Sequence, residues 1–426
     1  MKVSPARLAA FNVLLKIETE KAYSSVLLPI YEKDLSAADR SLCHELTLGT
    51  LRRQMYLDRV IDLFSNGKKL DEAVRIALRL GVYQLLFLDK IPDYSAVDES
   101  VSLVQIAKKT SAKGFVNAIL RRMTKEEPQI PFPDETERLS VETSHPRWLI
   151  EKWITDFGFA EAEKVALANN EAGGHAFRTL GDTLPEVVNA RPSEFVNGCY
   201  LTDKINSGLI TAAEKHEIYF QDEGSQMIAC AVGIPEGSNF LDVCAAPGGK
   251  TGLIAKRNAS QIKNGIAGDV YWQRAMVLRD NCRAQGVENV DVVQYDAEKG
   301  MPFADNSFDV VLVDAPCSGT GTIRHSPELR YFIKPEDIVE LSRKQLKILS
   351  NASKLMRRGG TIIYSTCSLE KEENEMVCDR FLSENNDFHS VRANVPDPFR
   401  TNAGFARTFP HRDGMDGFFI AEFQKK

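Results

Sequence analysis

Two cysteines, Cys317 and Cys367, each stand at the end of a short apolar run, in the segments VLVDAPCSGTG and TIIYSTCSLEK. A cysteine thiolate is a strong nucleophile, and an acid, Asp314, precedes Cys317 by three residues. The two cysteines are therefore candidates for covalent catalysis. The alternative is that both thiols are core residues, since free cysteine is among the most buried residue types. That alternative suits the cysteines in helical or irregular stretches, which are Cys43, Cys230, Cys282 and Cys378. The core interpretation explains less well why Cys317 and Cys367 both stand at the end of an apolar run. We therefore expect their two sulfurs to lie close together.

A glycine-rich turn, LDVCAAPGGKTG (241–252), follows another apolar run and precedes a helix-like segment. Gly248 and Gly249 let the backbone approach a ligand closely, and the start of a helix offers free N–H groups. The turn is neither a P-loop nor a GxGxxG dinucleotide turn. Asp269 and Asp296 end the next two apolar runs, where such acids bind ribose or adenine, or simply cap helices. Three consecutive features of this kind favour a bound adenosine cofactor.

These residues are positioned by short apolar runs that begin at about residue 238. The runs are NFLDVCA, GIAGDV, VDVVQYDA, FDVVLVDAP and TIIYSTC, with helix-like segments such as YWQRAMVLRDNCRAQG between them. Strands buried on both faces have this continuous apolar character, so the pattern predicts a parallel sheet with crossover helices. The cysteines and acids then stand at strand tips.

The chain of 426 residues predicts two or three domains. We expect an all-helical domain (1–127), a proline-marked linker (128–143), a small α+β segment (144–236) and an α/β domain (237–426). No run approaches a membrane span, no CxxC pair suggests zinc, and the cysteines suit a reducing cytoplasm. The net charge of −6 conceals a basic amino-terminal part, because residues 1–130 hold 20 Lys and Arg against 16 Asp and Glu. This part contains pairs of basic residues such as Arg52–Arg53, and on charge alone such pairs are usually a solvated helix face.

Three segments, LDVCAAPGGKT, DAPCSGTGTIRHSPELR and YSTCSLEKEENE, resemble the signature motifs of RNA cytosine-5 methyltransferases that use S-adenosylmethionine. The helical amino-terminal part resembles NusB, an RNA-binding fold, and the final DGMDGFFIAEFQ is similar to the last hairpin of the same enzymes. This combination is typical of the bacterial RsmB (Sun/Fmu) family, which methylates 16S ribosomal RNA. The resemblance implies a NusB-like domain followed by a Rossmann-like class I methyltransferase domain.

The resemblance also implies roles for particular residues. Cys367 would attack carbon 6 of a cytosine, Cys317 would release the product, and Asp314 would hold the base. Addition of the thiolate turns the ring into an enamine, whose carbon 5 can accept a methyl group. The residues implied to bind or adjoin S-adenosylmethionine are Cys244, Ala245, Ala246, Pro247, Gly248, Gly249, Lys250, Asp269, Arg274, Asp296 and Asp314. The residues alone leave open which cysteine attacks, and whether Lys250 neutralises the methionine carboxylate or contacts RNA.

We expect 16S ribosomal RNA as the partner, naked or in an early assembly intermediate, with basic amino-terminal helices on its phosphates. The target base must leave its stack to reach the thiol. We expect a cytoplasmic monomer without metal or membrane contact. One alternative is a different RNA, such as transfer RNA or large-subunit RNA, and another is a non-catalytic RNA-binding or antitermination factor. An amine methyltransferase is disfavoured, because the fourth run ends in Asp-Ala-Pro-Cys rather than in a Pro-Pro-Tyr or Pro-Pro-Phe turn.

Overall fold

The chain forms two compact units in the computed structural model, which describes residues 3–181, 183–186 and 189–426. The first unit comprises Met1–Glu171 together with Ile323–Ile333, and the second comprises Ala172–Thr322 and Lys334–Lys426. A short segment that follows the Cys317 turn in sequence therefore belongs to the amino-terminal unit.

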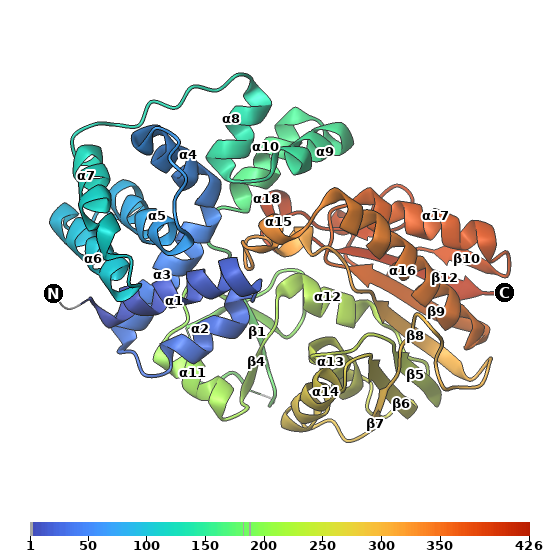
Figure 1. The fold of residues 1–426 in the computed structure, drawn as a ribbon. Coiled ribbons are helices and arrows are strands. Elements are labelled where there is room, and N and C mark those ends of the chain that lie inside the picture. Colours follow the sequence, from blue (N-terminus) through green and yellow to red (C-terminus); the bar gives the residue numbers. More distant parts are fainter. Residues whose placement is uncertain (1–2, 182, 187–188) are drawn as a thin grey trace. The chain divides into compact units, whose positions relative to one another are not determined.

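The amino-terminal part of the first unit is all-helical, which confirms the predicted helical domain (Figure 1, blue to cyan). Apolar side chains at helical spacing, such as Leu57, Val60 and Ile76, are fully buried in one shared core. The helices are α1 (Pro5–Glu20), α2 (Ser24–Glu32), α3 (Ala37–Arg52), α4 (Gln54–Ser65), α5 (Glu72–Phe87), α6 (Asp93–Ile106) and α7 (Lys113–Met123).

The remaining helices of this unit enclose a buried arginine. They are α8 (Glu135–Thr143), α9 (Arg147–Phe157), α10 (Phe159–Ala168) and the short α15 (Leu329–Phe332). Arg330 of α15 is fully buried and donates to the carbonyl oxygens of Thr143 (3.0 Å) and Asn169 (3.2 Å) and to Oδ1 of Asn170 (2.9 Å). Burial lowers the pKa of Arg330 to about 10. The end of the motif DAPCSGTGTIRHSPELR is thus anchored in the helical unit.

The second unit begins with a small antiparallel sheet in the order β2-β3-β1-β4. Phe177 and Ile218 of this sheet pack with Leu209 and Ala212 of α11 in a separate small core. The elements are β1 (His175–Thr179), β2 (Arg191–Pro192), β3 (Cys199–Thr202), α11 (Ser207–Glu214) and β4 (Ile218–Phe220).

The main sheet of the second unit has the order β10-β12-β9-β8-β5-β6-β7, and β11 also pairs with β12. The strands are β5 (Ser238–Asp242), β6 (Ile262–Asp269), β7 (Val290–Gln294), β8 (Phe308–Asp314), β9 (Met356–Thr366), β10 (Phe388–Val391), β11 (Ala406–Arg407) and β12 (Phe419–Lys425). The strands from β5 to β9 pair in parallel, as the apolar runs predict. The sheet is nevertheless mixed, because β12 runs antiparallel to both β9 and β10.

Helices pack on the sheet in two groups, which explains why its strands read as continuous apolar runs. Val310 and Leu312 of β8 share a core with α12, α13 and α14, whereas Val311 and Val313 share another with α16 and α17. Successive strand residues point to opposite faces, so both faces are buried. The helices of these groups are α12 (Glu223–Ala231), α13 (Gly249–Arg257), α14 (Trp272–Ala284), α16 (Pro335–Lys354) and α17 (Glu375–Glu384). The short α18 (Pro410–Asp413) precedes β12 in the chain. Short 3₁₀ helices span Thr110–Ala112, Thr320–Thr322, Lys371–Glu373 and Asp397–Phe399.

The strand order reverses beside β5, because the chain continues to β6 and β7 on one side and to β8 and β9 on the other. Open α/β sheets bind ligands at such a point, outside the carboxyl ends of the strands. The glycine-rich turn and both cysteines follow strands that end there. Within the described residues, no helix is both long and apolar enough to cross a membrane.

Candidate active site

The two cysteine sulfurs are in contact. Cys317 follows β8 and Cys367 follows its parallel neighbour β9, and their Sγ atoms lie 3.2 Å apart. The backbone N–H of Cys367 also donates to the Cys317 sulfur at 3.3 Å. Both residues are half-buried. The prediction that the two thiols converge is confirmed.

The surroundings of Cys317 keep a proton on its sulfur. The hydrogen bond with Cys367 and burial raise the pKa of Cys317 well above the usual thiol value, and the charges of Cys367 and Glu373 add to the effect. Two thiols in contact cannot easily ionise together. We therefore expect Cys317 to stay protonated in the resting pair.

Asp314 lies at the end of β8 and is held by two partners. Lys250 Nζ lies 2.8 Å from its Oδ2, and the Ser365 hydroxyl donates to its Oδ1 at 2.8 Å. Burial alone would lower the pKa of Lys250, but the Asp314 carboxylate outweighs burial and raises it. Lys250 is thus committed to Asp314, a pairing that sequence analysis did not foresee.

The glycine-rich turn has a backbone that requires glycine. Gly248 has a φ of +103°, and a Cβ there would lie 2.9 Å from the Leu278 side chain. Arg274 donates to the Ala246 carbonyl oxygen at 3.0 Å and lies 3.5 Å from Asp269 Oδ2. Arg274 therefore links the turn to the acid that ends β6.

Two further acids stand at neighbouring strand ends. Asp269 is buried and accepts the Tyr271 N–H at 3.0 Å. Asp296 follows β7 and is part-exposed, and the hydrogen bond with Lys299, at 3.1 Å, lowers its pKa. Both carboxylates stand at the sheet edge where the glycine-rich turn lies.

The comparisons with known proteins cover both units. The model of the 16S rRNA methyltransferase RsmB/F family matches residues 229–424, and the NusB family model matches residues 4–125. The chain is 33% identical to the probable ribosomal RNA small subunit methyltransferase B of Bacillus subtilis (strain 168), and the alignment covers 100% of both chains. The chain belongs to the RsmB/F family.

Other comparisons agree with this family. The probable ribosomal RNA small subunit methyltransferase B of Synechocystis is 32% identical, with 99% of both chains covered. Among solved structures, the crystal structure of PH0851 is 26% identical with a TM-score of 0.85 and covers 100% of both chains. The predicted NusB-like helical domain and Rossmann-like methyltransferase domain are confirmed.

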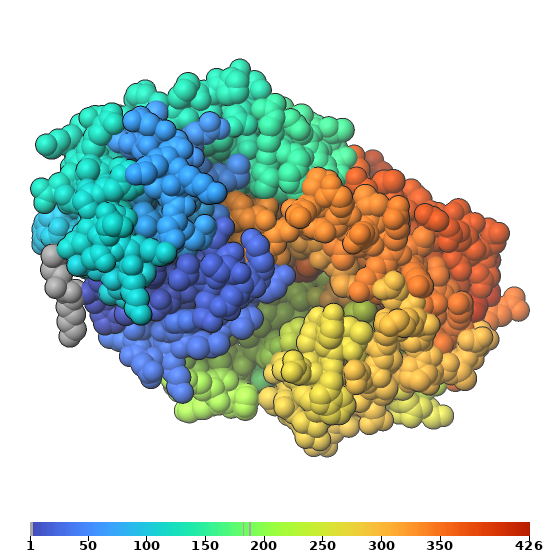
Figure 2. Space-filling view, in the orientation of Figure 1, coloured from blue at the N-terminus to red at the C-terminus, as the bar shows by residue number. Residues whose placement is uncertain are grey.

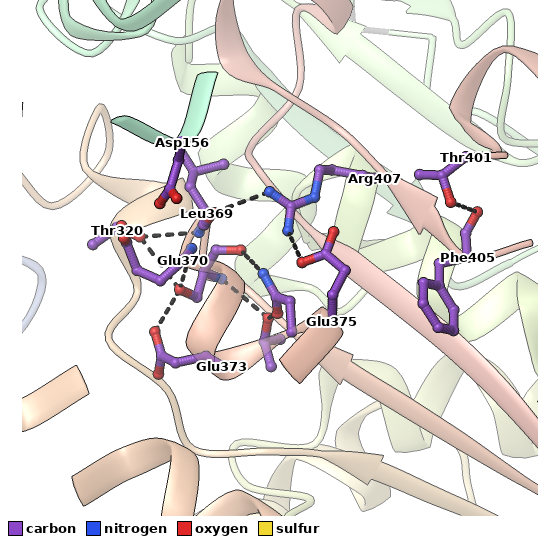
Figure 3. A network of polar contacts seen from close by, with 12 residues as sticks. Asp156, Thr320, Leu369, Glu370, Glu373, Glu375, Thr401, Phe405 and Arg407 are labelled. Atoms are coloured by element: carbon purple, nitrogen blue, oxygen red, sulfur yellow. Dashed lines mark hydrogen bonds and ion pairs between the residues drawn. The ribbon is translucent and has the colours of Figure 1, made fainter. Parts of the chain in front are cut away.

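Several residues that hold the site were missed by sequence analysis. Thr320 Oγ1 accepts the Leu369 N–H at 3.0 Å, which joins the two cysteine turns (Figure 3). Buried Arg407 donates to the Leu369 carbonyl oxygen (3.0 Å) and to Glu375 (2.7 Å). The segment EKEENE (370–375) contains four glutamates. Because all four are the same residue type, the sequence does not show which of them support the site and which face solvent.

Arg178 of the small sheet was also missed by sequence analysis. It is buried, donates to Gln221 and Gln285, and lies 3.4 Å from the Gly249 carbonyl oxygen at the start of α13. Burial lowers its pKa to about 10. This arginine ties the small sheet to the glycine-rich turn.

Exposed aromatic side chains follow Asp269. Tyr271 and Trp272 are 64% and 60% exposed, and Figure 2 shows the segment around α14, in yellow, at the surface of this view.

Most of the cysteines interpreted as core residues are buried. Cys43, Cys282 and Cys378 are buried, as the core interpretation predicts, while Cys230 is half-buried.

Proposed function

We propose that this chain transfers a methyl group to carbon 5 of a cytosine in 16S ribosomal RNA through a covalent adduct between Cys367 and the base. The contact between the Cys317 and Cys367 sulfurs, at 3.2 Å beside Asp314, carries the proposal. Methylation of an exocyclic amine needs no thiol, whereas carbon 5 needs a nucleophile on carbon 6.

The strand ends around β5 fit S-adenosylmethionine as the methyl donor. The turn 244–250 offers backbone N–H groups at the start of α13, and Asp269 offers a carboxylate of the kind that binds ribose hydroxyls. Asp296, which follows β7, would accept a hydrogen bond from an adenine amino group. Oδ1 of the buried Asp242, also at this edge, lacks a hydrogen-bond partner among the described residues. When bound, S-adenosylmethionine supplies an electrophilic methyl group at its sulfonium centre.

Asp314 and Cys367 then act on the base. Asp314, held by Lys250 and Ser365, keeps its carboxylate fixed to accept hydrogen bonds from the exocyclic amine of cytosine and from the ring nitrogen. The ring nitrogen takes up a proton from solvent as the thiolate adds and returns it to solvent on release. The Cys367 thiolate adds its electron pair to carbon 6, and the ring electrons move onto carbon 5, which thereby becomes the nucleophile.

Cys317 serves the release step. Once Cys367 is bonded to carbon, it no longer offers Cys317 a thiolate partner, so the hydrogen bond that is the largest cause of the raised pKa of Cys317 is lost. Cys317 can then lose its own proton to solvent, and the resulting thiolate accepts the proton from carbon 5 while the bond between carbon 6 and the Cys367 sulfur breaks and its electrons return to sulfur. The reaction thus ends with methylated cytosine, the Cys317 thiol and the Cys367 thiolate, and one proton has passed to solvent.

The remaining parts of the chain are proposed to hold the RNA. The NusB-like helices (1–127) would bind phosphates, and the segment 144–236 would contact RNA as well, while the methyltransferase domain (237–426) holds the reacting base. Bisulfite sequencing of ribosomal and transfer RNA from a strain that lacks the gene tests the substrate. We expect one protected cytosine of 16S RNA to become convertible and to be protected again on complementation. Loss of a mark in transfer RNA or large-subunit RNA alone would reassign the substrate.

A further inference from the structure

Glu373 is a buried acid that the proposed reaction does not use. It ends the 3₁₀ turn Lys371–Glu373, which follows β9, and its side chain is fully buried. No ion pair to Glu373 is seen within the described part of the chain. A buried carboxylate without a cation is costly unless hydrogen bonds satisfy it.

Four donors converge on this carboxylate. Oε1 accepts the backbone N–H of Ser318 and an amide N–H of Gln345, both at 2.9 Å. Oε2 accepts the hydroxyl groups of Ser318 and Ser368, whose oxygens lie 3.0 Å apart. Figure 3 shows Glu373 beside the turn that follows β9.

The two serines occupy equivalent positions, because Ser318 directly follows Cys317 and Ser368 directly follows Cys367. The backbone pairing of β8 and β9 ends where the Ala315 N–H donates to the Ser365 carbonyl oxygen, before either cysteine is reached. Beyond that point the Gly321 N–H donates to the Cys367 carbonyl oxygen at 2.9 Å, and the Leu369 N–H donates to Thr320. Glu373 joins the two turns immediately after the cysteines themselves.

Gln345 of α16 completes the arrangement. The same side-chain amide donates to Glu373 and, at 3.0 Å, to the carbonyl oxygen of Pro316. The residues on both sides of Cys317 are thus fixed, Pro316 by Gln345 and Ser318 by Glu373. An ionised carboxylate accepts at both oxygens and donates nothing, so it suits four donors better than any neutral side chain.

We propose that Glu373 is a positioning residue that holds the Cys317 and Cys367 turns together, so that the two sulfurs stay in contact during catalysis. Its role rests on the proposed two-cysteine reaction. Because reacting groups must be held within about 1 Å of their productive geometry, loosening the turns should lower kcat by about 10²-fold. The KM values for RNA and methyl donor should change little, since Glu373 is enclosed by protein.

The experiment measures the sulfur pair directly, with the full-length chain and phenylarsine oxide as a probe. Its arsenic atom binds two adjacent thiols and releases water, and mass spectrometry detects the adduct without RNA or methyl donor. Capture that disappears in the Cys317→Ala variant is assigned to the pair. We expect Glu373→Ala to lose this capture and to show the reduced kcat. Glu384→Gln, which alters an exposed acid at the end of α17, should match the wild type.

Glu373→Gln serves as the conservative variant. Its amide oxygen can face Ser318 N–H and Gln345, while its NH₂ group donates to the serine hydroxyls, so it should retain capture and most of kcat. If Glu373→Ala does not fold by circular dichroism, Ser368→Ala decides, with partial loss of both capture and kcat expected.

Either capture or kcat left at the wild-type level in Glu373→Ala would overturn the proposal. The proposed chemistry fails on a different result, namely methylation by Cys367→Ala, and arsenical capture still tests Glu373 in that case.

Discussion

The ammonium nitrogen of Lys250 lies 2.8 Å from a carboxylate oxygen of Asp314, which joins the glycine-rich turn to the turn that carries Cys317. The lysine begins a helix, where a cation is unfavourable by itself because the helix dipole is positive there. The acid compensates for that charge and is in turn oriented by it. The ion pair thus links the proposed cofactor site with the proposed base site.

Lys250→Met should therefore impair catalysis. Without its ammonium group, Asp314 keeps the Ser365 hydroxyl but loses the partner on its other oxygen, and we expect the single-turnover rate of methyl transfer to fall by about 10²-fold. Transfer of a radiolabelled methyl group to 16S RNA measures this rate. Lys263→Met, which makes the same change at an exposed position of β6, is the control. Equal rates in both variants would contradict the role of the ion pair.

The two cysteine variants should fail at different steps. Cys367→Ala removes the proposed nucleophile, so neither methylated RNA nor a covalent complex should form. Cys317→Ala leaves attack intact but removes the group that releases the product, so a covalent RNA–protein complex should accumulate. Denaturing gel electrophoresis with labelled RNA detects it. A complex that persists in Cys367→Ala and is absent from Cys317→Ala would reverse the assignment.

Asp242 should make the stability of the protein depend on pH. Burial raises its pKa from 3.8 to about 7. The folded state then binds more protons than the unfolded state between about pH 4 and pH 7, so stability falls as the pH rises through this window. Relative to Asp242→Asn, the wild-type free energy of unfolding should fall by at most about 4 kcal/mol and stay constant above pH 7. Urea unfolding of both proteins at several pH values measures the difference, and a difference independent of pH would refute the prediction.

Gly321→Ala should distort the cysteine turns. A Cβ at this position would lie 2.0 Å from the Gly417 carbonyl oxygen and 2.9 Å from that of Cys367. Both neighbours are backbone, so we expect a loss of about 1–3 kcal/mol in the free energy of unfolding and reduced methyl transfer. Gly114→Ala in α7 is the matched control, because a Cβ there meets open space, and it should be neutral or stabilising by up to about 1 kcal/mol. Similar unfolding curves for the two variants would count against the tight approach.

Much of the fold follows from local patterns. Apolar runs separated by helical segments predict the parallel strands from β5 to β9, since strands covered on both faces need apolar residues at every position. The antiparallel pairing of β12 with β9 has no such local cause. It depends on which edge of the sheet is still unpaired when the carboxy-terminal strand is added. The same holds for Ile323–Ile333, whose place in the helical unit depends on the burial of Arg330.

The sequence by itself determined that Cys317 and Cys367 would meet, because both end neighbouring parallel strands and such ends share one edge of a sheet. Only the tertiary structure decided which of the acids in EKEENE supports them and that Lys250 pairs with Asp314. The physical reason is that strand position is encoded locally by apolar spacing, whereas the partner of a charged side chain depends on long-range packing. Glu373 differs from its acidic neighbours only in where the fold buries it.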